Sequence, residues 1–425
     1  MNASIRPSVL RGSVEAVSSK SMAHRLLVLA MLADQPCEFV CNTTSLDIEA
    51  TARCLQALQD VRHSQDPSHK DGEFCVLDCG ESGTTLRFLL PVACALGIHA
   101  RFECHGRLME RPLAPLDREL YNHGIALRKE GHSILATGKL TPGRFVLPGD
   151  VSSQYVSGLL LATSVLGRPS EIWVSTPVQS RPYITLTTRA LELFGQDVSC
   201  GSVVYEGVTY ERFFVDPKTL VAPIRCVVEG DWSNAAFWLA AGTLEQEGLT
   251  VFGLDPTSPQ GDRAILAALA GFGARIARRT DAVRATLDNP RAARIDVGAI
   301  PDLVPPLAAI AATAPGTSKL TNASRLRLKE SDRLASVSAA INALGGHARI
   351  MEDDLVIRGV ECLSGGVIDA CNDHRIAMMG AVMATHATGD VVITDAECVA
   401  KSYPTFWQDY ASLGGRVSLS SESEG

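Results

Sequence analysis

One pattern recurs six times along the chain, at intervals of about 60 to 80 residues. Each copy opens with a short polar segment, runs into an Ala-rich apolar helix and a strand-like run, and continues into a second, amphipathic helix. A helix that is apolar on all sides is buried, whereas a helix with one apolar stripe covers a core from outside. The pattern therefore predicts a repeat architecture of six helix pairs. The polar starts lie at Ser21, Ser82, Ser152, Asp231, Asp302 and Asp373.

Strand-like runs alternate with the helices. Residues 171–175 and 390–394, for example, are rich in β-branched side chains. This alternation predicts the α/β (α+β) class, with units of strand, buried helix, strand, covering helix and hairpin in two sets of three. The covering helices are predicted to begin near Ser45, Arg111, Arg181, Gln260, Lys329 and Lys401. Glycines in the left-handed cap conformation are predicted to end four of them, at Gly195, Gly273, Gly345 and Gly414.

Length and charge limit what the chain can be. Its 425 residues are too many for one hydrophobic core and predict two or three domains. A net charge of −8 argues against a nucleic-acid partner, because proteins that bind nucleic acid usually carry a basic patch. The chain has no run of 18 apolar residues, which argues against a membrane partner. Its first residues lack the apolar core of a signal peptide. We therefore expect a cytoplasmic protein.

The twelve cysteines are scattered along the chain. The closest pairs, Cys37 with Cys41 and Cys75 with Cys79, have no matching histidine pair and do not give a zinc-ligand set. Free thiols are therefore expected rather than metal ligands or disulfides. Residues 62–72 are polar and contain proline, which is typical of a surface loop, and the acidic tail from Ser418 is expected to be frayed.

Polar and cationic side chains gather at the starts of the buried helices. A helix N-terminus presents free backbone N–H groups and the positive end of the helix dipole, and both favour anions. Lys20 and Arg25 flank one start, and Arg87 occupies the equivalent place in the next copy. Capping alone would account for one serine at each start, but not for the cations that accompany it. No glycine-rich nucleotide loop is present, so side chains and helix starts would have to hold any phosphate.

Two charged motifs allow both a structural and a functional interpretation. Residues 329–333 (KESDR) carry a lysine and an arginine four positions apart, which would share a helix face and repel by about 0.2–0.5 kcal/mol. The neighbouring acids could relieve this repulsion at a solvated helix start, or the motif could clamp an anion beside a carboxylate placed for proton transfer. Asp373-His374-Arg375 opens a buried helix, where charges must be paired or hydrated. It is either a capped ion pair or part of a site.

Taken together and in order, the motifs resemble the 5-enolpyruvylshikimate-3-phosphate synthase family of enolpyruvyl transferases, whose plant and bacterial members are targets of glyphosate. The resemblance covers nearly the whole chain. It is carried by Lys20-Ser21 with Arg25, Ser82-Gly83-Thr84 with Arg87, Glu110-Arg111-Pro112, Ser152-Ser153-Gln154, Ser180-Arg181-Pro182-Tyr183, Glu229-Gly230-Asp231, Gln260-Gly261-Asp262, Pro301-Asp302, residues 329–333, Asp373-His374-Arg375 and Lys401.

The resemblance implies a two-domain enolpyruvyl-transferase-like fold of six βαβαββ units, three per domain, closing on a cleft. The first domain would comprise residues 1–18 and 230–425, and the second residues 19–229. The implied reaction moves the enolpyruvyl group of phosphoenolpyruvate to the 5-hydroxyl of shikimate 3-phosphate by addition and elimination, and releases phosphate. It lies on the route to chorismate and the aromatic amino acids. No metal or organic cofactor is implied, the partners are the two small-molecule substrates, and the family's habit implies a monomer.

The resemblance also implies roles for individual positions. Asp302 would take the hydroxyl proton and Glu330 would protonate the methylene carbon, with Lys20 and His374 assisting. The shikimate 3-phosphate site would comprise Lys20, Ser21, Arg25, Ser152, Ser153, Gln154, Ser180, Tyr183, Asp302, Arg325 and Lys329. The phosphoenolpyruvate site would comprise Lys20, Gly83, Thr84, Arg111, Gln154, Arg333, Arg375 and Lys401. Both substrates together carry roughly five or six negative charges near neutral pH, which cations and helix N-termini would have to offset.

Two other interpretations stay open at this point. UDP-N-acetylglucosamine enolpyruvyl transferase shares the fold and the donor, but that family has Lys-Asn in place of Lys20-Ser21 and a reactive cysteine where this chain has Gly106. The second alternative is a non-catalytic anion-binding scaffold built on the same repeat. A scaffold has no use for proton-transfer carboxylates, yet Asp302 and Glu330 are both present.

Two positions depart from the commonest family pattern. Glu81 stands where many members have asparagine, and so does Arg325, four residues before Lys329. A new anion and a new cation at ligand-lining positions can compensate each other, so we predict that the two are coupled. In a double-mutant cycle, Glu81→Asn and Arg325→Asn should then have non-additive effects on the KM of phosphoenolpyruvate. Additive effects would reject the coupling. The departures put sensitivity to glyphosate in doubt, but not the reaction.

Overall fold

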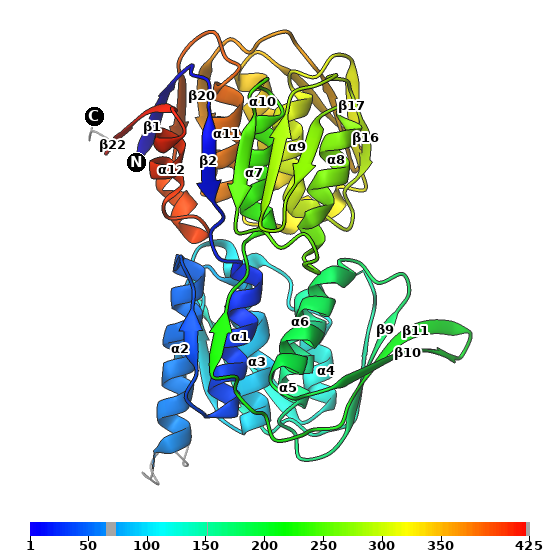
Figure 1. The fold of residues 1–425 in the computed structure, drawn as a ribbon. Coiled ribbons are helices and arrows are strands. Elements are labelled where there is room, and N and C mark those ends of the chain that lie inside the picture. The colour runs from blue at the N-terminus through cyan, green and yellow to red at the C-terminus, as the bar shows by residue number, and fades with distance from the viewer. Residues whose placement is uncertain (65–73, 151, 422–425) are drawn as a thin grey trace. The chain divides into compact units, whose positions relative to one another are not determined.

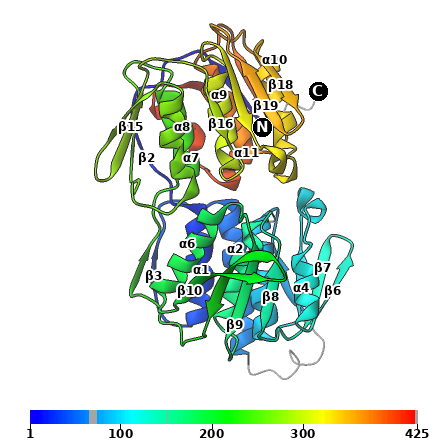
Figure 2. The ribbon, with the colours of Figure 1, turned by 90° about the vertical axis from the view of Figure 1, so that its right-hand side faces the viewer.

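The computed structural model describes residues 1–64, 74–150 and 152–421 and divides into two compact units (Figures 1 and 2). Unit 1 comprises Met1–Ser19 and Glu229–Gly425, and unit 2 comprises Lys20–Val228. Each boundary lies one residue from the boundary expected from the sequence. Each unit has its own hydrophobic core, and neither core includes residues of the other unit.

Five four-stranded sheets share one topology. In each sheet a parallel pair of strands is extended by an antiparallel hairpin, so that the second strand of the pair is central. Unit 2 holds two of these sheets. The first contains β4 (Cys75–Asp78), β5 (Ala100–Glu103), β7 (Ser133–Gly138) and β6 (Ile125–Glu130), and the second contains β8 (Arg144–Leu147), β9 (Ser170–Ser175), β11 (Val208–Val215) and β10 (Val198–Tyr205).

Unit 1 holds the other three four-stranded sheets. Two of them contain, in spatial order, β2 (Gly12–Glu15), β13 (Leu249–Phe252), β15 (Ala282–Thr286) and β14 (Arg275–Arg278), and β16 (Arg294–Asp296), β17 (Thr317–Thr321), β19 (Asp354–Arg358) and β18 (His347–Met351). The third contains β20 (Gly366–Asp369), β21 (Val391–Thr394), β1 (Asn2–Arg6) and β22 (Arg416–Ser420). Its hairpin positions are filled from opposite ends of the chain, with Ser4 facing Ser418. The expectation of a frayed tail from Ser418 is therefore wrong as far as Ser420, and residues 422–425 lie outside the described residues.

The sixth sheet is reduced. Among the described residues it consists of the parallel pair β3 (Glu38–Val40) and β12 (Arg225–Val227). The surface loop predicted over residues 62–72 begins too early, because Arg62 and His63 form the last turn of the preceding helix. The rest of that loop, from residue 65, lies outside the described residues.

Each unit has three helices in its core and three that cover it. The core helices are α1 (Lys20–Ala33), α3 (Gly83–Leu96) and α5 (Ser153–Thr163) in unit 2, and α7 (Trp232–Gly242), α9 (Val304–Ala311) and α11 (His374–Ala384) in unit 1. The covering helices are α2 (Leu46–His63), α4 (Leu116–Asn122), α6 (Arg181–Leu193), α8 (Ile265–Gly271), α10 (Arg333–Ala343) and α12 (Phe406–Ser412). Every residue of α7 and α11 is buried, as predicted for helices that are apolar on all sides.

The polar starts act largely as caps. The side chains of Ser82, Ser152, Asp231 and Asp373 each accept a hydrogen bond from a backbone N–H in the first turn of the helix that follows. Asp302 differs, because it lies in the 3-10 turn η4 (Pro301–Leu303) that precedes α9. The predicted glycine stops are confirmed, since all four glycines have positive φ angles between 77° and 96°.

Three predicted helix starts are wrong. The starts at Ser45 and Arg181 are confirmed, and Gln260 directly precedes the 3-10 turn η3 (Gly261–Ala264), which runs into α8 at Ile265. Arg111, Lys329 and Lys401 instead each come at the end of a 3-10 turn, and the α-helices begin four or five residues later. The turns are η2 (Gly106–Glu110), η5 (Ser324–Leu328) and η6 (Ala396–Lys401). Prolines follow two of these positions, at 112 and 404, and a residue before proline avoids the helical conformation. Lys329 and Arg333 therefore do not share a helix face.

Buried cysteines belong to the cores. All twelve cysteines are free, and the described residues contain no group of three or more His, Cys, Asp or Glu side chains placed to hold a metal. Burial raises the pKa of the Cys94 and Cys104 thiols to about 12, so both stay protonated and pack as small apolar side chains. A search of the described helices finds none with the length and hydrophobicity needed to cross a bilayer.

Helices α3 and α5 approach closely at Gly158, and we predict that this glycine cannot be replaced. A Cβ atom there would lie 2.3 Å from the carbonyl oxygen of Arg87 and 3.0 Å from Cγ of Pro91. Gly158→Ala should therefore lower the free energy of unfolding by about 1–3 kcal/mol, which outweighs the roughly 1 kcal/mol that alanine contributes in a helix interior. Denaturant unfolding measures the loss. Gly167→Ala is the control, because its Cβ would meet no atom within 4 Å, and an equal effect of both changes would contradict the prediction.

Candidate active site

Arg333, the first residue of α10, joins three helix starts in unit 1. Its Nε donates to Oδ2 of Asp373 at 2.9 Å, and its Nη1 donates to Oδ1 of Asp302 at 2.7 Å. Its Nη2 donates to Oε2 of Glu330 at 2.5 Å. Asp373 caps α11, and Asp302 lies just before α9. One fully buried guanidinium thus holds three carboxylates, of which Asp302 and Glu330 come from one copy of the repeat and Asp373 from the next.

The charges of this cluster stabilise one another. Burial alone would lower the pKa of Arg333, but Asp373, Glu330 and Asp302 outweigh it and hold that pKa above its ordinary value. Burial likewise disfavours ionised Asp302, yet the nearby cations hold the pKa of Asp302 well below its ordinary value. Asp302 is therefore a carboxylate at neutral pH and can accept a proton.

Three cations converge on Asp302. Besides Arg333, the Nζ of Lys329 donates to its Oδ1 at 3.0 Å, and the Nη2 of Arg375 lies 3.8 Å from its Oδ2. Arg375 also donates to the main-chain oxygens of Asp302, at 3.3 Å, and of Ser233, at 3.5 Å. Asp302 lies in the short 3-10 turn η4, where all three cations can reach it.

Three further predicted residues lie around this cluster. His374 is 1% exposed, and its Nδ1 lies 3.9 Å from Oδ1 of Asp373. The Nζ of Lys401, at the end of η6, donates to the main-chain oxygen of Asn372 at 2.8 Å. Arg325 lies in η5, and its positive charge acts on Lys329. The structure therefore gathers the predicted residues of unit 1 around a single group of charges.

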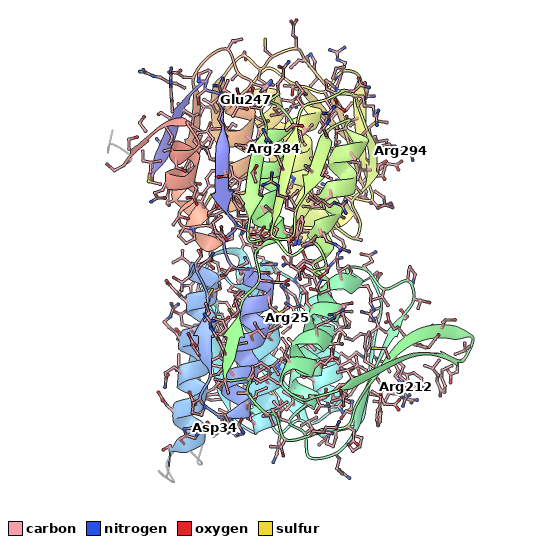
Figure 3. All side chains as sticks on the ribbon, in the orientation of Figure 1. Arg25, Asp34, Arg212, Glu247, Arg284 and Arg294 are labelled. Carbon is pink, nitrogen blue, oxygen red and sulfur yellow. The ribbon has the colours of Figure 1, made fainter. Side chains whose placement is uncertain are left out.

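Arg25 is a buried cation of unit 2 (Figure 3). Its guanidinium donates to Oγ1 of Thr187 at 2.8 Å, to the main-chain oxygen of Tyr183 at 2.8 Å and to Oγ of Ser157 at 3.3 Å. It also donates to the main-chain oxygen of Ser21. Burial lowers the pKa of Arg25 to about 9, so the group stays charged at neutral pH. Every acceptor recorded for it is a neutral oxygen, which is an unusual setting for a buried charge.

Lys20 has a carboxylate partner that the sequence analysis missed. Its Nζ lies 2.9 Å from Oδ2 of Asp47, in the first turn of α2. An acidic residue in the first turn of a helix is favoured by the dipole alone, so nothing in the sequence marked Asp47 as different. The hydroxyls of Ser157 and Thr187 that hold Arg25 were also missed, because a single buried hydroxyl in a helix carries no sequence pattern of its own.

Two arginines converge over the start of α3. A Cβ atom on Gly83 would lie 2.6 Å from Nη1 of Arg87 and 2.7 Å from Nη1 of Arg111, so a side chain there would push the two guanidinium groups away. Arg87 donates from Nη1 to Oε1 of Gln154 at 2.8 Å, and the Nε2 of Gln154 donates to Oγ1 of Thr84 at 2.8 Å. Two guanidinium groups beside a helix N-terminus make a strong site for an anion.

The remaining predicted residues of unit 2 stand at the starts of α5 and α6. Ser152 caps α5 by accepting from the N–H of Gln154 at 3.3 Å, and Ser153 is the first helical residue. Ser180 precedes α6 with a φ angle of 53°, and its side chain makes no capping hydrogen bond to that helix. Tyr183 contributes its main-chain oxygen to Arg25. These positions are therefore set by the same two helix starts.

The carboxyl group of Glu81 lies close to Gly106. A Cβ on Gly106 would lie 2.7 Å from the carboxyl carbon of Glu81, and Gly106 has a φ angle of 52°. A side chain at position 106 would have to displace the Glu81 carboxyl group and take a backbone conformation that favours glycine. The cysteine that the other enolpyruvyl transferase family has here would therefore be strained beside Glu81.

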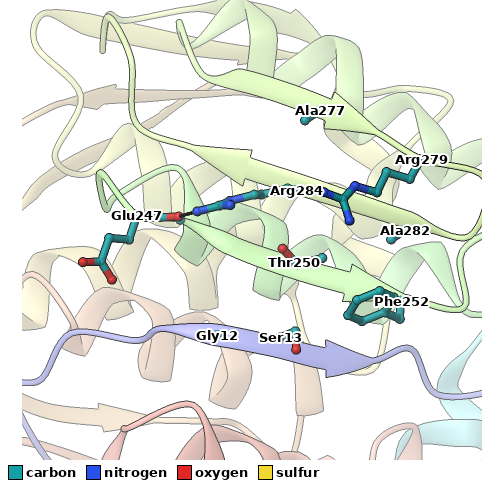
Figure 4. A pocket seen from close by; sticks show the side chains of 10 residues that line it. Gly12, Ser13, Glu247, Thr250, Phe252, Ala277, Arg279, Ala282 and Arg284 are labelled. Carbon is teal, nitrogen blue, oxygen red and sulfur yellow. Dashed lines mark hydrogen bonds between the residues drawn. The ribbon is translucent and has the colours of Figure 1, made fainter.

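A surface hollow of about 530 Å³ lies elsewhere in unit 1 (Figure 4). It runs over β2, β13, β14 and β15, where Arg284 donates to the main-chain oxygen of Glu247 at 2.5 Å. None of the residues predicted for the site lines it. This hollow is therefore not the candidate active site.

Comparison with known proteins decides the family. The sequence model of the EPSP synthase (3-phosphoshikimate 1-carboxyvinyltransferase) family matches residues 5–410. This chain belongs to that family. The 3-phosphoshikimate 1-carboxyvinyltransferases of Clostridium kluyveri and Clostridium perfringens are 38% and 35% identical to it. The alignments span 97% of this chain in both cases, and 97% and 98% of the respective relatives.

Solved structures agree on the fold. EPSP synthase from Acinetobacter baumannii matches with a TM-score of 0.73 at 23% identity, over 98% of this chain and all of that one. The enolpyruvyl transferase NikO from Streptomyces tendae matches with a TM-score of 0.74 at 18% identity, over 99% of both chains. The chain therefore has the enolpyruvyl-transferase fold, and as a family member it is an enzyme of the shikimate pathway, on the route to the aromatic amino acids.

Proposed function

We propose that the residues gathered here transfer the enolpyruvyl group of phosphoenolpyruvate to the 5-hydroxyl of shikimate 3-phosphate. The observation that carries this assignment is the pair Asp302 and Glu330, two carboxylates held on one arginine among further cations. Addition needs a base for the hydroxyl proton and an acid for the methylene carbon, close to groups that hold anions. Mixing both substrates with the unmodified protein should release phosphate, and a failure to do so would overturn the proposal.

The proposed chemistry has two steps. In the addition, Asp302 accepts the proton of the 5-hydroxyl of shikimate 3-phosphate. The oxygen of that hydroxyl bonds to C2 of phosphoenolpyruvate, and Glu330 gives a proton to C3. In the elimination, the Glu330 carboxylate takes a proton back from C3, the double bond between C2 and C3 forms again, and the bond from C2 to the phosphate oxygen breaks, so that phosphate leaves with that electron pair. The products are the enolpyruvyl ether and phosphate. Lys20 and His374 assist proton transfer in this scheme.

Both carboxylates begin the cycle bonded to cations, and the substrates change that. Glu330 lies 2.5 Å from Nη2 of Arg333, and an arginine so placed favours the ionised form of a carboxyl group. When an anionic substrate takes over part of Arg333, this bond weakens and Glu330 can be protonated more easily. Arg333 thus binds the substrate and sets the protonation of the acid.

Shikimate 3-phosphate is assigned chiefly to the hydroxyls and cations around Arg25. A buried guanidinium whose recorded acceptors are all neutral gains most from an anion, because the attraction acts in a site of low dielectric constant. Short polar side chains beside it suit the hydroxyls of the ring. The full set is Lys20, Ser21, Arg25, Ser152, Ser153, Gln154, Ser180, Tyr183, Asp302, Arg325 and Lys329.

Phosphoenolpyruvate is assigned to cations from both units. Arg111, whose guanidinium lies beside the start of α3, would hold one anionic group together with Gly83 and Thr84. Arg375 and Arg333 would take another, since both already contact the carboxylate of Asp302. Lys20, Gln154 and Lys401 complete the set. We further propose that the enzyme works as a cytoplasmic monomer without nucleic-acid or membrane partners, which a net charge of −8 supports.

Replacing the proposed acid should leave binding but remove turnover. Glu330→Gln keeps the shape of the side chain and cannot deliver the proton at the required acidity, so phosphate release should fall by about 10²–10⁴-fold. Binding of shikimate 3-phosphate, measured by calorimetry, should change little. Glu361→Gln, an exposed position in the same unit, is the matched control. Full activity of Glu330→Gln would rule out this role.

Replacing Arg25 should separate the two substrates. Arg25→Ala removes a charged donor, so the Kd of shikimate 3-phosphate should rise by about ten- to a hundredfold, while the KM of phosphoenolpyruvate at saturating shikimate 3-phosphate rises less. Titration calorimetry and steady-state phosphate release measure the two quantities. Arg189→Ala, exposed on α6, is the control. An equal loss for both substrates would contradict the division of the site.

A further inference from the structure

Four side chains of unit 2 form a buried chain of hydrogen bonds that the proposed chemistry does not use. Nδ1 of His24 lies 2.7 Å from Oγ1 of Thr51, which lies 2.6 Å from Oγ1 of Thr85, which donates to Oγ of Ser82 at 2.8 Å. None of the four residues is more than 1% exposed. They come from α1, α2, α3 and the cap of α3, so the chain connects three helices near two of their starts.

The order of the protons in this chain follows from its last bond. Each hydroxyl has one proton, and the hydroxyl of Thr85 gives its proton to Ser82. The proton between the two threonines must then come from Thr51. The hydroxyl of Thr51 has no second proton to give, so Nδ1 of His24 is the donor and Nε2 carries the lone pair.

His24 is neutral in this setting. Burial, Lys20 and Arg25 all lower its pKa, well below the ordinary value, so the ring does not charge near neutral pH. Its Nε2 has no hydrogen-bond partner among the described residues. Burying Nε2 without a partner costs free energy that an apolar side chain of similar size would avoid. Packing alone therefore does not explain a histidine at this position, and its hydrogen bond through Nδ1 is the feature that needs an explanation.

The two ends of the chain stand next to residues that we assign to the substrates. His24 directly precedes Arg25 and lies one turn after Lys20 and Ser21. At the other end, Ser82 caps the helix that opens with Gly83 and Thr84. Arg25 is itself held by α5 and α6, through Ser157 and Thr187. Arg25 also lies over the ring of Phe88 in α3, 5.0 Å from its centroid. The chain through Thr51 is the hydrogen-bonded link between α1 and the cap of α3 and adds to that packing.

We infer that His24, Thr51 and Thr85 are positioning residues that hold the start of α3, and with it the Gly83–Thr84 anion site, against the start of α1. The inference rests on the function proposed above, because it assigns that anion site to phosphoenolpyruvate. The three side chains touch no substrate and transfer no proton. They act on the geometry of Gly83, Thr84 and the two arginines that converge there.

The test removes one hydroxyl and keeps the shape. Thr51→Val leaves Nδ1 of His24 and Oγ1 of Thr85 without their common partner, so the KM of phosphoenolpyruvate should rise about tenfold. The Kd of shikimate 3-phosphate should change little, because the partners of Arg25 remain. Thr51→Ser keeps the hydroxyl and loses only the methyl group, so this variant should have the KM of the unmodified enzyme. A change in thermal stability alone, or an equal loss for both substrates, would overturn the inference.

A second measurement applies even if Thr51→Val does not fold. In the unmodified enzyme, ¹⁵N NMR of the histidine rings should show His24 neutral with the proton on Nδ1, and a proton on Nε2 would contradict the proton order. His24→Asn, whose amide N–H can replace Nδ1–H, should keep the KM of phosphoenolpyruvate, whereas His24→Leu should raise it. Phosphate release by the unmodified enzyme separates the two proposals. Its absence would overturn the reaction, and its presence with an unchanged KM in Thr51→Val would overturn only the positioning role.

Discussion

The ion pairs of the buried guanidinium of Arg333 are the interactions on which the arrangement of the helix starts in unit 1 depends. Removing such a charge from water costs several kcal/mol, and only well-placed partners offset that cost. Here the partners are Asp302, Glu330 and Asp373, and two of them lie at the starts of other helices. The site and the fold are therefore one problem, because the carboxylates proposed for proton transfer are also the groups that allow Arg333 to be buried.

Much of the fold could be predicted from the sequence because each repeat carries its own signals. Apolar helices, capping residues such as Ser82 and terminal glycines act locally, and they fixed the order and type of the elements. The three helix starts predicted at Arg111, Lys329 and Lys401 were wrong because each of these residues ends a 3-10 turn, and a charged residue before an amphipathic stretch looks the same in the sequence whether it ends such a turn or starts an α-helix. The pairing of β1 with β22 could not be predicted either, since the two strands lie at opposite ends of the chain.

The candidate site was predicted through the resemblance more than through the residues alone. Charged motifs such as residues 329–333 allowed both a solvated helix start and an anion clamp, and only the fold brings Arg333 to Asp302 and Asp373. Partners without a sequence pattern were missed. Asp47 looks like any acid in a first turn, and His24 and Thr51 look like isolated polar residues inside helices, until the structure places them 2.7 Å apart.

The buried arginines of the two units have different partners, and the difference has a chemical consequence. Arg333 in unit 1 is bonded to carboxylates and must exchange partners to hold a substrate. Unit 2 has an ion pair between Lys20 and Asp47, but the recorded acceptors of Arg25 are neutral. An anion reaching Arg25 therefore displaces no carboxylate, whereas in the proposed function an anion reaching Arg333 weakens the bond of that arginine to Glu330. The neutral partners of Arg25 thus suit binding alone, and the charged partners of Arg333 suit a site in which binding also changes the state of the proposed acid.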